Sequence, residues 1–199
     1  MISAILLAAG QSTRMGSENK LLMRIGGRTL IERMVDVVTA SDIAETILVL
    51  GHQAGRVRPL VEAKPVRIVE NLDYAEGMGS SFQAGLQAVS PEASAVMICL
   101  TDQPLLETED VNHLIHAFQA QQEKSMAVPR FKGQRGNPVL FSTRYRAEVM
   151  ATRGPVAGCR GIIQKYPEAV LAVEMNNDHI LWDMDTPADY EAIQKKLLG

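Results

Sequence analysis

The sequence predicts an α/β protein built as a three-layer α/β/α sandwich around a mostly parallel, Rossmann-like sheet. Two observations support this fold class. Short, continuous apolar runs recur along the chain, as expected of strands that are buried on both faces of a parallel sheet. Segments with apolar residues at helical spacing separate most of these runs. This alternation implies right-handed crossovers, and it places ligands at the carboxyl ends of the strands.

The predicted strands begin with Ile2 to Ala8, a run that contains no charged side chain. Comparable runs follow at intervals that leave room for helices between most of them. They are Thr46–Leu50, Val66–Glu70, Ala95–Leu100, Met126–Pro129, Pro138–Phe141 and Ala169–Val173.

Three helices are marked by apolar stripes or by capping residues. Residues 30–38 and 111–118 each carry one apolar stripe at helical spacing. Thr108 is the expected N-cap of the second of these helices. The last helix is expected to start at Thr186 as N-cap, with Asp189 at the capping-box position. Its inward-facing residues are predicted to be Tyr190, Ile193 and Leu197.

Composition and charge limit the classes of protein that the sequence can encode. The 199 residues fit one domain over 1–199, and a net charge of -3 argues against a broad nucleic-acid-binding face. Apolar runs are too short to span a membrane, and the first residues lack the features of a signal peptide. The two cysteines, Cys99 and Cys159, have no metal-site spacing and are interpreted as structural. We therefore expect a cytoplasmic protein, and a monomer.

A glycine-containing loop after the first strand is the strongest functional signal. The thirteen residues from Ala8 to Lys20 are rich in Gly, Ser and small side chains, and they include Arg14. Backbone N–H groups of such a loop can approach phosphate oxygens while two cations neutralise their charge. The loop matches neither the P-loop nor the G-x-G-x-x-G dinucleotide motif. The alternative is a surface loop with incidental charges.

A second glycine-containing segment follows the third predicted strand. Residues 71–81 contain two glycines, one of them Gly77, and two serines before a short helical segment. Ser80 or Ser81 could cap that helix and contact a ligand. A simple glycine turn explains the pattern equally well.

Three aspartates are candidate metal ligands. Asp102 directly follows the fourth predicted strand, so it is expected in the ligand crevice at the carboxyl edge of the sheet. Asp183 and Asp185 lie two residues apart before the last helix, and in extended chain both would point the same way. Either could complete an oxygen-rich Mg²⁺ site with Asp102, water and phosphate. Turn formation and helix capping are the alternatives for these residues.

A cationic connection links two short predicted strands at residues 131–138. Lys132 and Arg135 stand in it where an anionic second substrate could dock. A solvated hairpin tip is an equally good interpretation. A further segment, residues 153–161, carries two more arginines.

The chain resembles the MobA-like nucleotidyltransferases in several motifs. LAAGQSTRMG, from Leu7 to Gly16, resembles the opening signature of that family. YAEGMGSS, TDQP, RGNPVLF and DMDTPADY follow in the expected order. Together these motifs cover nearly the whole chain and are similar to the molybdenum cofactor cytidylyltransferase (MocA-like) branch. The resemblance implies a sheet of the nucleotide-diphospho-sugar transferase type.

The resemblance also implies an activity and roles for particular residues. The activity is transfer of CMP from CTP to the terminal phosphate of molybdopterin, giving molybdopterin cytosine dinucleotide and pyrophosphate. The opening Leu7-Ala8-Ala9-Gly10 is the variant associated with CTP. The implied nucleotide and acceptor contacts, besides those four residues, are Gly16, Gly77, Ser81, Arg135 and Asn137. Arg14 and Lys20 would hold the triphosphate, and Asp102 and Asp185 would hold Mg²⁺, with Mn²⁺ as a substitute.

Two departures from the family pattern leave the acceptor open. The branch usually has R-G-H-P where this chain has Asn137 in place of the histidine, and residues 154–160 lack the acid of G-D-x-G-A-R. A nucleotidyltransferase for another phosphorylated acceptor, such as a sugar 1-phosphate, is therefore one alternative. A noncatalytic accessory that delivers the cofactor to a client molybdoenzyme is another.

Overall fold

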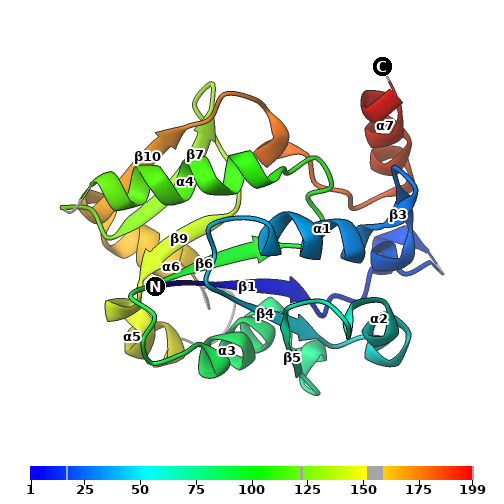
Figure 1. Ribbon diagram of the computed structural model, residues 1–199, viewed down its shortest axis with the longest axis horizontal. Helices are drawn as coiled ribbons and strands as arrows, with labels where there is room; N and C mark the ends of the chain where they lie inside the picture. Colours follow the sequence, from blue (N-terminus) through cyan, green and yellow to red (C-terminus); the bar gives the residue numbers. More distant parts are fainter. Residues whose placement is uncertain (17, 122, 152–158, 199) are drawn as a thin grey trace.

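The computed structural model describes residues 1–16, 18–121, 123–151 and 159–198. An eight-stranded sheet forms its middle layer (Figure 1). The strand order is β10-β7-β9-β6-β1-β4-β5, and β8 pairs with β7. The strands are β1 (Ile2–Ala8), β4 (Glu45–Leu50), β5 (Arg67–Glu70), β6 (Ala95–Leu100), β7 (Met126–Phe131), β8 (Gln134–Arg135), β9 (Val139–Ser142) and β10 (Val170–Glu174). The short strands β2 (Arg24–Ile25) and β3 (Arg28–Thr29) form a separate antiparallel pair.

The sheet is mostly parallel, as predicted. β1 runs parallel to its neighbours β4 and β6, β4 to β5, and β7 to β10. Only β9 and β8 are antiparallel to their neighbours within this described sheet. Because β9 is antiparallel to both β6 and β7, the last two run in the same direction. The carboxyl ends of β1, β4, β6 and β7 therefore share one edge of the sheet, where the sequence placed the ligand.

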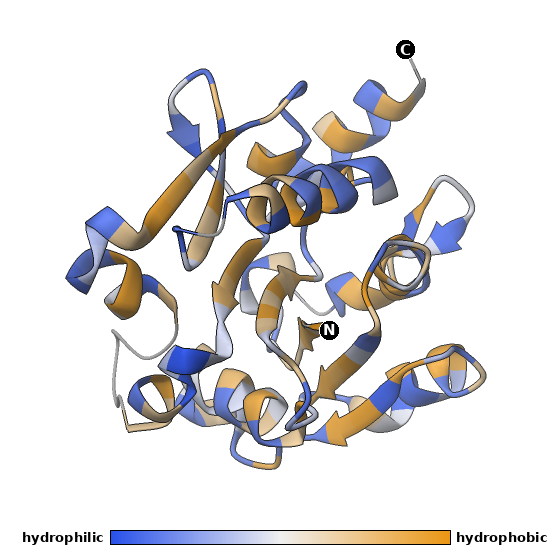
Figure 2. Ribbon diagram, turned by 60° about the vertical axis from the view of Figure 1, so that its left-hand side comes forward, coloured by the Kyte–Doolittle hydropathy of each residue, from blue (hydrophilic) through white to orange (hydrophobic). Residues whose placement is uncertain are grey.

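Helices cover both faces of the sheet, which gives the predicted three layers (Figure 1). On one face, α1 (Leu30–Thr39), α2 (Ala54–Val61) and α4 (Thr108–Ala120) bury apolar residues against the strands. On the other face lie α3 (Met78–Ala88), α5 (Arg146–Ala151) and α6 (Cys159–Lys165). The strands in the middle carry the most hydrophobic residues (Figure 2). A last helix, α7 (Pro187–Leu198), lies beyond the carboxyl edge near β2 and β3.

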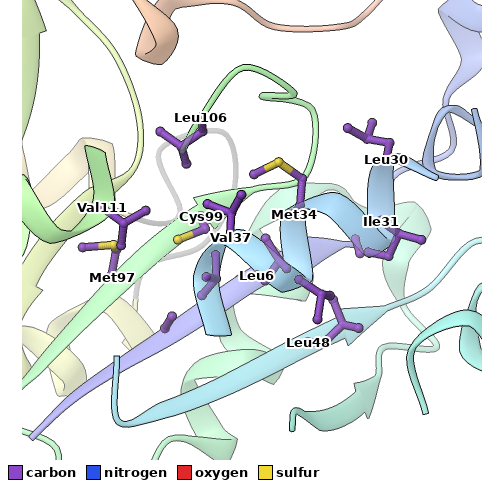
Figure 3. Packing of buried hydrophobic residues seen from close by; sticks show 14 of the residues in the cluster. Leu6, Leu30, Ile31, Met34, Val37, Leu48, Met97, Cys99, Leu106 and Val111 are labelled. Atoms are coloured by element: carbon purple, nitrogen blue, oxygen red, sulfur yellow. The ribbon is translucent and has the colours of Figure 1, made fainter. Parts of the chain in front are cut away.

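The packing of α1 shows how the apolar stripe builds the core (Figure 3). Leu30, Ile31 and Met34 are fully buried and lie over Leu6 and Leu48 of the sheet. Burial of each such side chain contributes about 1.5–3 kcal/mol. The helix starts at a capping box in which Thr29 and Glu32 exchange hydrogen bonds. The stripe and the cap together fix where the loop after β1 re-enters the core.

The expected caps are correct at one helix and wrong at two others. Thr186 and Asp189 form the predicted capping box of α7. The N-cap of α4 is Glu107 rather than Thr108, because the Asp110 carboxylate accepts the backbone N–H of Glu107. Neither serine caps α3, which begins at Met78 after Gly77, so Ser81 lies within its first turns.

One inward-facing residue of α7 is also corrected. Ile193 is fully buried and Tyr190 packs against the core, whereas Leu197 is 40% exposed. Leu197 lies near the end of the helix, where the described chain covers it only in part. Helices α2, α5 and α6 have no counterpart in the prediction, because they are short and α2 contains Pro59.

The cysteines and the helices bear on two further expectations. Cys99 is fully buried in the core, and burial raises the pKa of its thiol to about 12. Both cysteines are free thiols, so no disulfide joins them. None of the helices in the described residues has the length and apolar run needed to cross a bilayer.

Candidate active site

The loop after β1 turns back over the carboxyl edge of the sheet because two of its apolar side chains are anchored in the core. Met15 and Leu21 are buried, each within a short 3₁₀ turn. Ser12 adopts a left-handed conformation, and its hydroxyl accepts the backbone N–H of Lys20. Asn19 caps the second turn by accepting the N–H of Leu21. The polar residues between these anchors are therefore held at the sheet edge.

A cleft of about 380 Å³ opens beside this loop. Its walls come from the ends of β1 and β6, from the loop itself and from the start of α3. The lining residues are Leu7, Ala9, Gly10, Gln11, Ser12, Thr13, Lys20, Leu21, Tyr74, Ala75, Gly77, Met78, Ser81, Leu100, Thr101 and Asp102. Lys20 and Asp102 thus share one cavity, as the sequence interpretation requires.

Four charged side chains from three separate segments of the chain meet at one end of this cleft, where Lys20 and Asp102 line it directly. The Lys20 ammonium lies 2.9 Å from a carboxylate oxygen of Asp102 and 3.1 Å from one of Asp185. The other Asp185 oxygen lies 2.9 Å from the Arg14 guanidinium. The side chain of Lys20 is only 13% exposed, whereas that of Arg14 is 69% exposed. We call Arg14, Lys20, Asp102 and Asp185 the charged cluster.

Backbone contacts fix the two carboxylates of the charged cluster. Thr101, at the end of β6, donates its hydroxyl hydrogen to the carbonyl of Leu7 in β1. The carbonyl of Asp102 accepts the N–H of Met184, which ties the β6 end to the segment before α7. Asp189 accepts the N–H of Asp185, so the capping box also orients this residue. The backbone at both aspartates is therefore tied to neighbouring elements, at Asp102 to the segment before α7 and at Asp185 to the first turn of α7.

Asp102 keeps one oxygen without a partner. Its Oδ1 atom is buried and has no hydrogen bond in the described part of the chain. A buried carboxylate oxygen without a donor or a cation is costly. This oxygen is therefore available to a ligand that carries positive charge.

The structure separates the two aspartates that the sequence left as alternatives. Asp185 pairs with Lys20 and Arg14, whereas Asp183 accepts a hydrogen bond from the amide of Gln103. Partial desolvation and the negative charges of Asp102 and Asp185 raise the pKa of Asp183 above its usual value. Asp183 is thus a neighbour of the charged cluster and not part of its ion-pair network.

The residues named from the resemblance divide into those that line the cleft and those that do not. Leu7, Ala9, Gly10, Gly77 and Ser81 line it. Other positions from that set lie elsewhere: Ala8 points to the opposite face of the sheet, and Gly16, Arg135 and Asn137 are not among the lining residues. Ala8 faces away because side chains alternate along β1.

The cationic connection is a hairpin, as one of the two interpretations held. Lys132 and Gly133 both have positive φ angles and form its two-residue turn between β7 and β8. Arg135 is exposed on β8. The ammonium of Lys132 lies over the ring of Phe131, 5.2 Å from its centroid. The further segment at 152–158 lies outside the described residues.

Comparison with known proteins identifies the family. A family model described as the MobA-like NTP transferase domain matches residues 4–170. The chain belongs to this family. Membership makes it a nucleotidyltransferase. The matched span contains the cleft and three residues of the charged cluster, Arg14, Lys20 and Asp102, whereas Asp185 follows it.

Two relatives of this MobA-like chain differ in name and in how much of their length it matches. Nicotine blue oxidoreductase of Paenarthrobacter nicotinovorans is 30% identical over 189 residues, which cover 93% of this chain and 92% of that protein. The bifunctional protein GlmU of Solibacter usitatus is 34% identical over 116 residues, covering 57% of this chain. The matched span is 25% of that GlmU protein, so the similarity concerns about a quarter of its length.

Solved structures share the fold over nearly the whole chain. Rv0371c from Mycobacterium tuberculosis H37Rv superposes with a TM-score of 0.82 at 25% identity, covering 98% of this chain and 97% of that one. A manganese complex of the same protein has a TM-score of 0.77. 4-Diphosphocytidyl-2C-methyl-D-erythritol synthase from Anaerococcus prevotii has a TM-score of 0.81 at 19% identity, covering 100% of this chain and 96% of that one. The last likeness shows the fold alone.

Sequence reasoning missed several cleft residues of this MobA-like transferase. Tyr74 and Met78 line the cleft, and the ring of Tyr74 meets that of His52 edge-on. Gly51 shows how closely this wall of the cleft is packed. A Cβ atom on Gly51, at the end of β4, would lie 2.7 Å from the Cβ atoms of Ala9 and Tyr74. Only glycine allows β4 to end so close to the cleft wall.

Proposed function

We propose that this chain transfers CMP from CTP to the terminal phosphate of molybdopterin, releasing pyrophosphate and giving molybdopterin cytosine dinucleotide. The observation that carries the proposal is the charged cluster at the end of the glycine-containing cleft. Its two cations can neutralise the phosphates of CTP, and its two carboxylates can hold a divalent cation. The cleft walls beside Gly10 and Gly77 bring backbone close to the bound nucleotide.

The residues present fit a divalent metal ion, for which Mg²⁺ is proposed and Mn²⁺ is the substitute. Asp102 and Asp185 contact the same ammonium, so their oxygens surround one position that favours positive charge. Asp102 Oδ1 has no other partner in the described chain. The described residues contain no group of three or more His, Cys, Asp or Glu side chains placed to hold a metal. Two carboxylates with substrate phosphates and water match the way proteins usually bind Mg²⁺.

The chain's own residues then act on charge rather than on protons. A phosphate monoester has a second pKa of about 6, so the acceptor arrives largely as a dianion. It therefore needs no general base to remove a proton. One of its oxygens bonds to the α-phosphorus of CTP, and the bond from that phosphorus to pyrophosphate breaks. Lys20 would stabilise charge on the transferring group, and Arg14 would stabilise charge on the leaving pyrophosphate. A bound divalent ion supplies further positive charge on the phosphate oxygens.

The choice of CTP and of the acceptor rests on the motifs. Leu7-Ala8-Ala9-Gly10 supports CTP, because the resemblance associates this variant of the motif with that nucleotide. Asn137 departs from the branch pattern, so a sugar 1-phosphate or another phosphorylated compound stays the alternative acceptor. The cytoplasm is the proposed location, and the two free thiols are compatible with it. A monomer and delivery to a client molybdoenzyme belong to the same proposal.

A second candidate comes from the full-length similarity to nicotine blue oxidoreductase. An oxidoreductase needs an electron donor, and the loop after β1 lacks the G-x-G-x-x-G pattern typical of dinucleotide-binding domains. The two cations of the charged cluster can also neutralise a triphosphate, whereas hydride transfer does not require them. We therefore place nucleotidyl transfer first.

The test is to incubate the protein with each of the four NTPs, Mg²⁺ and molybdopterin, and to measure the pyrophosphate released. We expect release with CTP and molybdopterin together. Parallel reactions replace molybdopterin by a sugar 1-phosphate, or replace CTP by NADH or NADPH with a dye acceptor. Release with the sugar phosphate alone would move the assignment to that acceptor. CTP binding without any pyrophosphate would favour the accessory function, and dye reduction would favour the oxidoreductase.

A further inference from the structure

Two arginines stand directly opposite each other on the hairpin beside the active site. Arg130 of β7 and Arg135 of β8 are cross-strand partners in an antiparallel pair. Their side chains therefore leave the same face of the sheet, with Cβ atoms about 4.5–5.5 Å apart. Like charges in this position destabilise a sheet. Both side chains are exposed, so solvent screens part of this repulsion, and an anion bound between them would offset the rest.

A third arginine joins them from the neighbouring helix. Phe131 packs against the core cluster on the α1 and α4 side, so Arg130, one residue earlier, points to the side of α6. Arg160 is exposed in the first turn of α6. Partial desolvation and the positive charges of Arg160 and Arg130 lower the pKa of Arg135. The three guanidinium groups thus act on one another across the hairpin and the helix.

No carboxylate neutralises this trio in the described chain. None of the three guanidinium groups takes part in an ion pair or a side-chain hydrogen bond there. The nearest acid in register is Glu174 of β10, whose carboxylate instead accepts the backbone N–H of Lys132. The residues outside the described ranges are 17, 122, 152–158 and 199, and none of them is Asp or Glu. Glu174 therefore stands beside Arg130 without forming an ion pair with it, and no ion pair is formed by Arg135 or Arg160 in the described chain.

Two contacts join the hairpin that carries Arg130 and Arg135 to the segment at Asp102. A Cβ atom on Gly136, the residue after Arg135, would lie 2.4 Å from the carbonyl oxygen of Ile180, so the backbones are in contact there. The same carbonyl accepts a hydrogen bond from Gln103, which follows Asp102. The hairpin and Asp102 are thus joined through two contacts. The glycine-containing loop approaches Asp102 from the other direction.

We propose that Arg130, Arg135 and Arg160 bind the phosphate monoester of the acceptor substrate. This inference rests on the proposed function and assigns the second substrate's anchoring group. Guanidinium groups match phosphate oxygens in geometry and stay charged at all relevant pH values. Arg14 and Lys20 serve the triphosphate on one side of Asp102, and the arginine trio holds the phosphate monoester on the other.

The direct test is binding of inorganic phosphate, measured by titration calorimetry at low ionic strength. We expect the double variant Arg130→Gln/Arg135→Gln to bind at least about 10-fold more weakly than the native chain, because two charge-assisted contacts are lost. Arg67→Gln is the matched control. Arg67 is exposed at the start of β5, on the opposite edge of the sheet, and binding should stay within about twofold. Lys20→Ala should keep the trio's phosphate binding.

Two further measurements separate binding from folding and from the proposed function. The double variant should melt at the same temperature as the native chain or up to about 3 °C higher, because like charges are removed. With turnover, it should raise the KM for the phosphorylated acceptor at least about 10-fold and leave the KM for CTP within about twofold. Unchanged phosphate binding in the double variant, or loss only in Lys20→Ala, would overturn the inference. If no acceptor gives pyrophosphate, the proposed function fails, while the phosphate titration still decides the arginine site.

Discussion

The ion pairs of Asp185 predict a change in nucleotide affinity whose sign is unusual for an active-site substitution. Asp185 pairs with Lys20 and Arg14, the two cations that are proposed to bind the triphosphate. Asp185→Asn removes this competition while keeping the size of the side chain. CTP should therefore bind more tightly to the variant than to the native chain when no divalent metal is present.

The magnitude follows from the exposure of the two pairs. The Arg14 side chain is 69% exposed, so its pair contributes about 0.2–1 kcal/mol. The Lys20 side chain is 13% exposed, and its ion pair with Asp185 contributes a comparable amount. A sum of about 0.4–2 kcal/mol corresponds to about 2- to 30-fold tighter binding. When a divalent metal is present, the variant should bind CTP more weakly than the native chain, because it lacks one of the two proposed carboxylate ligands.

The assay is titration calorimetry of CTP in EDTA and again in excess Mn²⁺. Asp42→Asn serves as the charge-matched control, since Asp42 pairs with His116 and stands before β4, away from the cleft. That control should leave both affinities within about twofold. If Asp185→Asn weakens metal-free binding or leaves it unchanged, the carboxylate does not compete with the triphosphate and the reasoning is refuted.

Three other substitutions test the site and the fold. Lys20→Ala should lower turnover at least about 10²-fold, as expected for one lost electrostatic stabiliser, and turnover within threefold of the native value would reject its role. Gly51→Ala should lower the melting temperature by about 3–10 °C, because the added Cβ meets two side-chain carbons at 2.7 Å; an unchanged melting curve would contradict this clash. The hydrogen bonds from Trp182 and Lys196 lower the pKa of Asp178, so its stabilising effect is present at neutral pH and disappears as the pH falls through the folded-state pKa. Asp178→Asn should therefore lower the melting temperature by about 1–3 °C at pH 7 and by less at pH 3, and a difference that grows with acidity would argue against this ion pair.

Much of the fold could be predicted because its signals are local. The continuous apolar runs of β1 and β6 indicate strands that are buried on both faces, and both strands lie in the middle of the sheet. The stripe of α1 and the capping box of α7 likewise depend on residues within one or two turns. Where the local signal was weak, as in α2 with its internal Pro59, the helix was missed.

The site was predicted in part for the same reason. A strand followed by glycines, serines and cations identifies the loop, and the position of Asp102 after β6 identifies its edge of the sheet. The sequence could not choose between Asp183 and Asp185, because both fit the spacing. The structure distinguishes them by their partners. Gln103 donates a hydrogen bond to Asp183, whereas Lys20 forms an ion pair with Asp185.

The sequence by itself therefore determined the α/β class, the position of the glycine-containing loop and the residue types of the charged cluster. Only the tertiary structure decided that Ala8 faces away from the cleft, that Glu107 caps α4, and that Arg130 stands opposite Arg135. The physical reason is the distance along the chain over which each interaction acts. Periodicity and capping act over a few neighbouring residues, whereas ion pairing and strand register depend on segments that meet only after the sheet has formed.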